Sequence, residues 1–287
     1  MHLRHLMGRV FETPLLIEAE KGRLIAEIVL HRSEGPQIQI DDDEPAPAPN
    51  LRGRPYALEH GIAIIPVHGT LVHRTRGIEA LSGLMSYEQI QGMLKVALSD
   101  PGVRGIVLDI SSPGGDVDGA FELADWIHAL RGRAQPVWAV GTGKAASAAY
   151  VIGRAADRFL VGPGTLTGSI GVLWIHIDQS KAEEEAGLVV TELFHGAFKA
   201  DGSRHHALGD AERARIEALL GRVYGLFVDR VAAWGGLSAD AVRATEAAVY
   251  LGADAVAAGL ADGVMRMDEA IGALRRTFTP GRSLVSA

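Results

Sequence analysis

The sequence predicts an α/β fold in which a mainly parallel sheet is covered by helices, and three observations lead to this prediction. Short apolar runs at residues 62–67 and 103–110 indicate buried strands, and stretches with a helical apolar period lie between such runs. Alternating strands and helices imply right-handed crossovers and therefore parallel strands. After Lys199 the pattern is helical only, which predicts a helical C-terminal region.

Local signals place the individual elements. Ser86 and Gln89 form a capping box, in which each side chain satisfies a backbone N–H, and this box begins a helix. Asp210 caps a long amphipathic helix that ends at Gly235 and Gly236. The remaining pattern predicts strands at 137–140 and near 157–161, 170–176 and 188–194, and helices at 117–130, from about 145, and near 178–186, 238–246 and 252–259.

The chain divides into four segments by composition. Residues 1–32 predict a helical or mixed N-terminal arm. Residues 33–57 predict a linker, because an acidic run is followed by alternating Pro and Ala, which favour an extended, solvated chain. Residues 58–270 form the main domain and residues 271–287 a C-terminal tail.

Composition and charge exclude several classes of function. The chain of 287 residues contains no cysteine, which excludes disulfides, thiolate metal sites and a cysteine nucleophile. Its net charge of −7 argues against a nucleic acid partner. No apolar run reaches the about 20 residues of a membrane span and no signal peptide is expected, so we expect a cytoplasmic protein. No metal ion or other cofactor is expected.

Two adjacent glycines follow the strand at residues 103–110. Gly114 and Gly115 stand in a Ser-Pro-Gly-Gly turn that leads into a helix, where backbone N–H groups can converge without obstruction. Such groups can stabilise an oxyanion, either a tetrahedral intermediate or an enolate. An ordinary strand-to-helix turn would have the same residues.

Ser147 lies where a strand gives way to an alanine-rich helix. Its small neighbours allow another backbone to approach closely, as a nucleophile requires. The surrounding residues match neither a phosphate-binding loop nor the Gly-x-Ser-x-Gly turn of hydrolases. A serine in such a helix can also be only a small packing residue.

Lys199 follows an apolar run and Gly196, and it stands between Phe198 and Ala200. Desolvation disfavours an ammonium ion and lowers the pKa of a lysine, which would let Lys199 act as a general base. Most lysines are instead solvated surface charges.

Four motifs occur in a characteristic order: Ser-Pro-Gly-Gly at 112–115, Ala-Ser-Ala-Ala-Tyr at 146–150, Thr-Gly-Ser-Ile-Gly-Val at 167–172 and Gly-Ala-Phe-Lys at 196–199. Together they resemble the signal peptide peptidase A family of Ser-Lys serine peptidases, which have a Clp/crotonase-like fold. The phrases Phe-Glu-Thr-Pro-Leu-Leu-Ile at 11–17 and Ile-Pro-Val-His-Gly-Thr-Leu at 65–71 are most similar to the phage head-maturation branch of that family.

The resemblance implies a role for each candidate residue. Ser147 would be the nucleophile and Lys199 its base, in a variant of the Ser-His-Asp arrangement. Backbone N–H groups near Gly114, Gly115 and Ala148 would bind the oxyanion, and Ser169 would orient the lysine. Residues 58–270 would then be the peptidase domain.

The resemblance also implies partners. Peptide or protein substrates such as capsid, scaffold or portal proteins would bind in an extended form by strand addition. The protein would act in the host cytoplasm or the phage prohead, as a ring-shaped homo-oligomer whose dyad forms within one subunit or between two.

Several alternatives stay open. Within the same family, the chain would be a bacterial signal-peptide or quality-control peptidase. A Clp-type Ser-His-Asp protease would need His128, His176 or His195 as its base. A crotonase-type acyl-CoA hydratase or isomerase, or an inactive assembly protein, belongs to another class. Two further features favour structural roles: Asp109 as a carboxylate that supports the fold, and His205 with His206 as a solvated pair.

Overall fold

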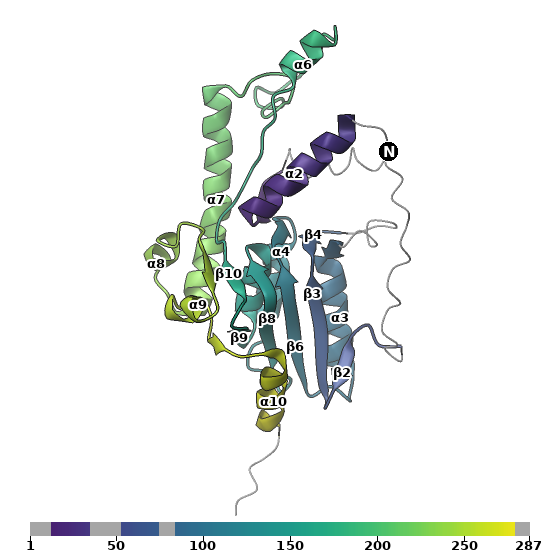
Figure 1. Ribbon diagram of the computed structural model, residues 1–287, viewed down its shortest axis with the longest axis vertical. Helices are drawn as coiled ribbons and strands as arrows, with labels where there is room; N and C mark the ends of the chain where they lie inside the picture. The colour runs from purple at the N-terminus through teal and green to yellow at the C-terminus, as the bar shows by residue number, and fades with distance from the viewer. Residues whose placement is uncertain (1–12, 35–52, 75–83, 279–287) are drawn as a thin grey trace, which may run out of the picture. The chain divides into compact units, whose positions relative to one another are not determined.

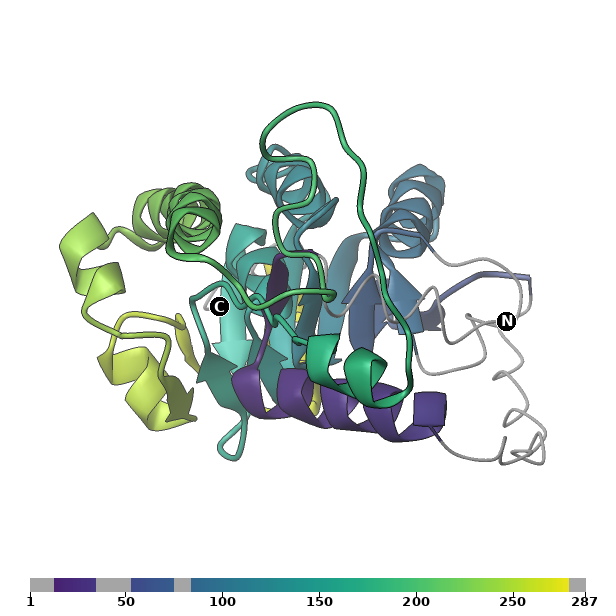
Figure 2. The same cartoon turned by 90° about the horizontal axis from the view of Figure 1, so that it is seen from above.

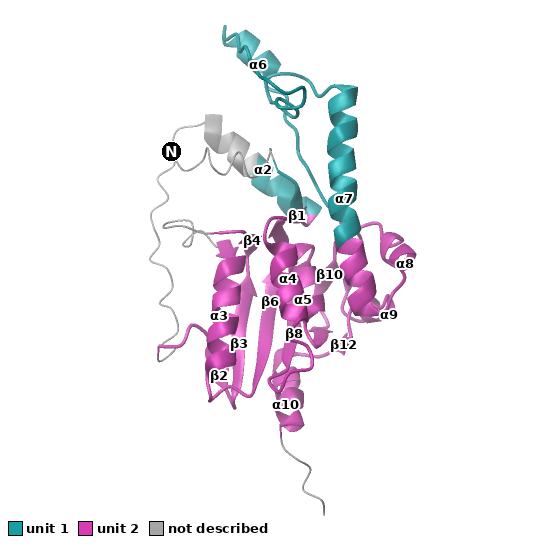
Figure 3. Cartoon of the chain, turned by 180° about the vertical axis from the view of Figure 1, so that it is seen from behind, with its two compact units in different colours: residues 1–15, 19–38, 172–226 teal, residues 16–18, 39–171, 227–287 magenta. Residues whose placement is uncertain are grey.

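The computed structural model describes residues 13–34, 53–74 and 84–278 (Figure 1). The chain forms two compact units, which Figure 3 distinguishes by colour. Unit 1 contains residues 1–15, 19–38 and 172–226, and unit 2 contains residues 16–18, 39–171 and 227–287.

Unit 2 is built on a mainly parallel sheet (Figure 1). Its strands lie in the order β11-β10-β8-β6-β3-β2, with β9 beside β8 and β12 beside β9. Pairs β3–β6, β6–β8, β8–β9, β8–β10 and β9–β12 are parallel, and the outer strands β2 and β11 are antiparallel to their neighbours. The bounds are β2 Ala57–Glu59, β3 Ile62–His68, β6 Gly105–Ser112, β8 Val137–Ala146, β9 Arg158–Val161, β10 Leu166–Gly168, β11 Val249–Leu251 and β12 Gly263–Val264.

Helices cover this sheet as the fold prediction requires. Helices α3 (Tyr87–Ser99) and α4 (Ala120–His128) lie side by side along one face, as Figure 2 shows. Helix α10 (Met267–Thr277) packs Leu274 and its neighbours against the sheet. Val107 of β6 and Val140 of β8 belong to the same buried cluster as Leu274. The predicted α/β class with a helical C-terminal region is therefore confirmed.

The capping box at Ser86 is confirmed in atomic detail. The Gln89 N–H donates to Ser86 Oγ over 3.1 Å, and the Ser86 N–H donates to the Gln89 side chain over 2.9 Å. Helix α3 then buries Ile90, Leu94 and Ala97, which share one helical face.

A second, small sheet lies beside the main one in the order β1-β7-β4-β5. Its strands are β1 Leu15–Ile17, β4 Thr70–Val72, β5 Leu84–Ser86 and β7 Gly114–Asp116. The backbone of β4 approaches β7 so closely that a Cβ atom on Gly115 would lie 2.7 Å from the Leu71 nitrogen and would overlap the Leu71 carbonyl. Only glycine fits there.

Unit 1 contains helices α2 (Ala19–Glu34) and α6 (Ser180–Glu185) and the first part of α7 (Asp210–Gly235). The strand expected near 188–194 is wrong, because residues 188–194 have no strand partner and expose Val189 and Leu193. The strand expected near 170–176 is also wrong. There the chain makes only one isolated bridge, between Leu173 and Leu15, and the strand lies earlier, at β10.

Other boundaries differ because long-range pairing decides them. The helix expected from about residue 145 begins at Ala148 as α5 (Ala148–Ala155), since β10 pairs with residues 144–146 and keeps β8 extended. The C-terminal helices are α8 (Ala239–Arg243) and α9 (Ala253–Ala257), and strands β11 and β12 beside them were not expected. Helix α10 continues across residue 270, and most of the expected linker at 33–57 lies outside the described residues.

One ion pair fastens the C-terminal region to helix α5. Asp262 accepts a hydrogen bond from Arg154 Nη1 over 2.6 Å and another from the Phe159 N–H over 2.6 Å. The Arg154 side chain is only 7% exposed. Because this cation is buried, removing its partner leaves an uncompensated charge.

We therefore expect Asp262→Asn to lower the free energy of unfolding by about 3 kcal/mol, measured by urea denaturation. As a control, Asp240→Asn removes a carboxylate that is 99% exposed and should change stability by less than about 0.5 kcal/mol. Equal effects of the two substitutions would contradict this role of the buried pair.

Candidate active site

Ser147 stands at a strained turn between β8 and α5. Its backbone has φ 55° and ψ −118°, a conformation that L residues rarely adopt, and its N–H donates to the Gly168 carbonyl over 2.8 Å. The alanines on both sides are fully buried, so no larger side chain blocks the turn. Although the sequence lacks the Gly-x-Ser-x-Gly pattern, the chain makes the same kind of strand–turn–helix elbow.

Gly114 lies directly against this elbow. With φ 98°, it is in the region that favours glycine, and a Cβ atom there would lie 2.9 Å from Ser147 Cβ and 3.0 Å from the Ala148 nitrogen. The structure thus brings Gly114, Ser147 and Ala148 together, as the sequence predicts. The Gly114 N–H donates to Ser112 Oγ over 3.1 Å. Gly115 is explained differently, by its contact with β4.

Ser169 also belongs to this site. Strand β10 pairs in parallel with β8, so that Gly168 is level with Ala146 and Ser169 follows at the level of Ser147. Ser169 has φ 53°, and its N–H donates to the Ala248 carbonyl over 2.9 Å. The two serines therefore occupy adjacent positions at the carboxyl ends of parallel strands.

The nucleophile candidate is buried. Ser147 has no exposed surface, and in the described part of the chain its Oγ makes no hydrogen bond. A buried hydroxyl without a partner costs free energy, which is typical of a group kept for reaction rather than for folding.

Lys199 lies in unit 1, whereas the other candidate residues lie in unit 2. Its side chain is exposed, and its N–H closes a turn on the Gly196 carbonyl over 3.0 Å. The desolvated surroundings expected for a lysine base are thus not supplied by this turn. The Ser147–Lys199 pairing stays a prediction.

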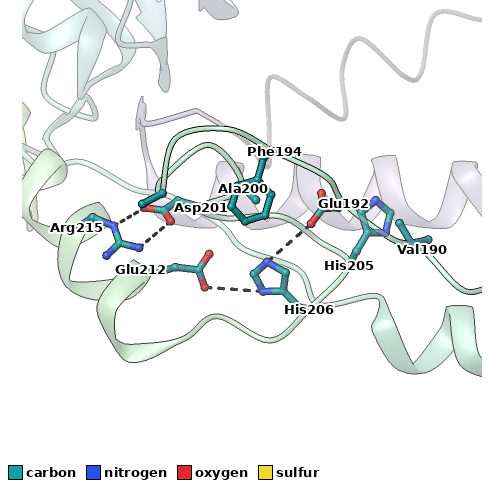
Figure 4. A pocket seen from close by; sticks show the side chains of 10 residues that line it. Val190, Glu192, Phe194, Ala200, Asp201, His205, His206, Glu212 and Arg215 are labelled. Atoms are coloured by element: carbon teal, nitrogen blue, oxygen red, sulfur yellow. Dashed lines mark hydrogen bonds and ion pairs between the residues drawn. The ribbon is translucent and has the colours of Figure 1, made fainter.

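A pocket of about 470 Å³ lies in unit 1 (Figure 4). Among the residues that line it are Ala197 and Ala200, which lie close to Lys199 in the sequence. Arg215 holds Asp201 in a two-pronged ion pair, and His206 lies 3.8 Å from Glu212 and 4.0 Å from Glu192. A hydrogen bond to the Ala207 carbonyl and these carboxylates raise the pKa of His206.

The second histidine of the expected solvated pair, His205, is also engaged. It contacts Glu183 at 2.6 Å, and both histidines are only partly exposed. We conclude that this pair organises the loop of unit 1.

The three histidines of the Clp-type alternative are placed elsewhere. His128 ends helix α4 and stacks on the Trp234 ring, with ring centroids 4.6 Å apart. Burial lowers the pKa of His128. His176 bonds to the Ser203 carbonyl in unit 1, and His195 is exposed there. None of these contacts involves Ser147.

Sequence reasoning missed a polar cluster on β3, β6 and β8, in which His68 ends β3 while Asp109 and Thr142 lie within the other two strands. His68 Nε2 lies 3.0 Å from an Asp109 oxygen, and the Thr142 hydroxyl donates to the other oxygen over 2.6 Å. The signal was available, because His68 and Asp109 both stand near the ends of predicted parallel strands.

Family comparisons place these residues in a known context. The model for Peptidase family S49 matches residues 129–278, more than half of the chain, and includes both Ser147 and Lys199. The chain belongs to peptidase family S49. A model for Clp protease matches residues 83–160, which contain Gly114 and Ser147. The expected family and Clp-like fold are confirmed, and both matching models describe peptidases rather than acyl-CoA enzymes.

Individual relatives lead to the same family. Capsid assembly protease C of Escherichia phage lambda is 40% identical over 99% of this chain and 68% of that protein. Head-tail preconnector protein GP5 of Enterobacteria phage P21 is 37% identical over 94% of this chain but only 56% of that protein. A putative signal peptide peptidase SppA of Enterococcus faecium is 28% identical over 68% of this chain. The chain thus spans little more than half of the phage P21 relative.

Among residues 13–34, 53–74 and 84–278, no helix is both long and apolar enough to span a bilayer.

The His68–Asp109 pair makes a testable contribution to stability. Its hydrogen bond raises the pKa of His68, so His68 stabilises the fold in full below its unfolded pKa of about 6.5 and this contribution is lost as the pH rises through the folded value. Burial would raise the pKa of Asp109, but hydrogen bonds from His68 and Thr142 outweigh it and lower this pKa. Asp109 therefore contributes to stability above about pH 3.9. The ion pair thus stabilises the fold between this pH and the pH at which His68 loses its proton in the folded protein.

We expect His68→Ala to lower the free energy of unfolding by about 0.5 kcal/mol near pH 5.5 and by less near pH 9, because the pair is partly solvated. Urea unfolding at both pH values measures the difference, with the exposed His195→Ala as control. A larger effect near pH 9 would refute the assignment.

Proposed function

We propose that this chain is a serine endopeptidase that uses Ser147 and Lys199 as a catalytic dyad and processes proteins of a phage head. The observation that carries the proposal is the strained turn at Ser147, with Gly114 and Ala148 packed against it. A buried, unbonded hydroxyl beside a backbone N–H at a helix start suits acyl transfer.

In the proposed reaction, neutral Lys199 takes the proton from Ser147 Oγ while that oxygen attacks the scissile carbonyl carbon. The negative charge that forms on the carbonyl oxygen is bound by N–H groups near Gly114, Gly115 and Ala148, and the Gly114 N–H exchanges its hydrogen bond to Ser112 Oγ for one to this oxygen. Lys199 then gives its proton to the leaving amine as the C–N bond breaks. Water hydrolyses the acyl-enzyme and regenerates Ser147.

The exposure of Lys199 supports an assembly as part of this proposal. A solvated ammonium is a poor base at neutral pH, and desolvation is what lowers a lysine pKa. A neighbouring subunit that covers the 196–200 turn would supply this desolvation. The proposed state is therefore a ring-shaped homo-oligomer, in which the same patch is used head to tail.

The two phage relatives support the choice of substrate. They are called a capsid assembly protease and a head-tail preconnector protein, and both match nearly all of this chain. The proposed substrates are thus capsid, scaffold or portal proteins, cut in the host cytoplasm or prohead. Relatives named as signal peptide peptidases match less of the chain.

Each dyad residue can be tested separately. We expect Ser147→Ala and Lys199→Ala each to lower kcat for a scaffold protein or casein by at least about 10³-fold, while urea unfolding shows a folded protein. Lys181→Ala, which removes another lysine of unit 1, is the control and should keep full activity. Full activity of Lys199→Ala would overturn the dyad and favour a histidine base, whereas inactivity of the unmodified protein on every substrate would favour the assembly-protein alternative.

Mixing two inactive variants tests whether the dyad forms within one subunit or between two. If Ser147 and Lys199 come from different subunits, an equal mixture of Ser147→Ala and Lys199→Ala subunits, dissociated and reassembled, should regain about a quarter of the original activity, because that share of sites receives both intact residues. No recovery, with reassembly shown by light scattering, would mean that both residues come from one subunit.

A further inference from the structure

Strand β7 carries the glycines of the proposed oxyanion site, and both of its edges are occupied. On one edge, Gly115 pairs with Leu71 of β4, and the two backbones can approach closely because glycine has no Cβ. Separating these strands would lose this close packing. On the other edge lies β1, from the N-terminal arm. A peptide that adds to β7 as a strand therefore finds no free edge unless β1 leaves.

Leu16–Glu18 belongs to the same compact unit as Ser147. The Glu18 N–H donates to the Pro113 carbonyl over 2.8 Å. Since Glu18 follows β1 directly and Pro113 precedes β7 directly, the two strands run antiparallel. This is how an extended peptide binds by strand addition.

The backbone of this segment reaches the nucleophile. A methyl group placed on Gly114 would overlap the Leu16 carbonyl oxygen and would also touch Ser147 Cβ and the Ala148 nitrogen. The Leu16 carbonyl thus lies at the glycine that faces the proposed nucleophile. Leu16 and Ser147 are both fully buried.

A side chain adds specificity to this contact. Glu18 forms an ion pair with Lys144, with a nitrogen–oxygen distance of 3.1 Å and with 15% of the glutamate and 32% of the lysine exposed. Lys144 lies where the register of β8 against β6 shifts, three residues before Ser147. Leu16 lies beside Gly114, and Lys144 contacts Glu18, the residue two positions later.

We propose that Leu16–Glu18 occupies the substrate's place on β7 and that Lys144 is a specificity-determining residue for an acidic side chain. This inference rests on the proposed peptidase function. The class of peptide it assigns to this edge of β7 is an extended segment with aliphatic residues beside Gly114 and a glutamate or aspartate opposite Lys144. Leu16–Glu18 is a built-in competitor for the same edge, and substrate must displace it.

Access to residue 147 can be measured without any peptidase activity. The chain has no cysteine, so Ser147→Cys introduces a unique thiol whose alkylation by iodoacetamide is followed by intact mass. With the arm unchanged we expect slow alkylation. Glu18→Gln or Lys144→Gln in this background should raise the rate about two- to five-fold, because each removes the ion pair that helps to hold the arm.

Two further measurements separate occupancy of the cleft from a general loosening of the fold. Exchanging the charges, by Glu18→Lys together with Lys144→Glu, should restore slow alkylation. A peptide copying residues 13–20 should protect the thiol of the Glu18→Gln variant when added in the millimolar range, which is the effective concentration of a short tethered segment. Glu59→Gln, at an exposed position of β2, is the control and should not change the rate.

The inference is overturned if the rate is the same with and without Glu18→Gln, or if the peptide gives no protection. Because alkylation needs no turnover, either result stands even if the dyad variants show that the chain is not a peptidase. Where peptidase activity is present, Lys144→Gln should raise KM for a peptide with glutamate at the matching position relative to KM for its glutamine counterpart, because loosening the arm helps both peptides equally.

Discussion

Close approach between backbones at Ser147 is the constraint on which the site depends. The serine can take its rare conformation because β10 fixes its N–H and alanines surround it. Gly114 then fits against Ser147 and Ala148 only without a side chain, and Gly115 fits against Leu71 for the same reason. Each close contact adjoins the previous one, so Ser147, the small sheet and the segment Leu16–Glu18 are packed together.

The sequence predicted those parts of the fold that local chemistry decides. The capping box at Ser86 and the alternation of apolar runs and helices have local physical causes, and the structure agrees with them. The expectation that the two glycines lead directly into a helix is wrong, because they stand in strand β7, between β1 and β4. The strand expected near 188–194 failed because an apolar run becomes a strand only beside a partner strand. The extension of β8 to Ala146 was not predictable locally, since the pairing with β10 decides it.

The site shows the same division. Ser147, Gly114 and Ala148 were predicted from motifs and lie together in the structure. The ion pair between Glu18 and Lys144 joins residues far apart in sequence, and neither residue has a local signal for the other. Lys199 shows a further limit, because its local sequence does not reveal which distant parts of the chain surround its side chain.

The pairing of Asp262 with Arg154 has a consequence for the order in which parts of the chain fold during synthesis. Helix α5 begins after Ser147 and carries Arg154 near its other end, while Asp262, the carboxylate that pairs with this arginine, lies far towards the C-terminus. During synthesis, Ser147 leaves the ribosome well before Asp262 does. Until then Arg154 lacks this counter-ion, so helix α5 gains its full set of native contacts only after the C-terminal region has been synthesised.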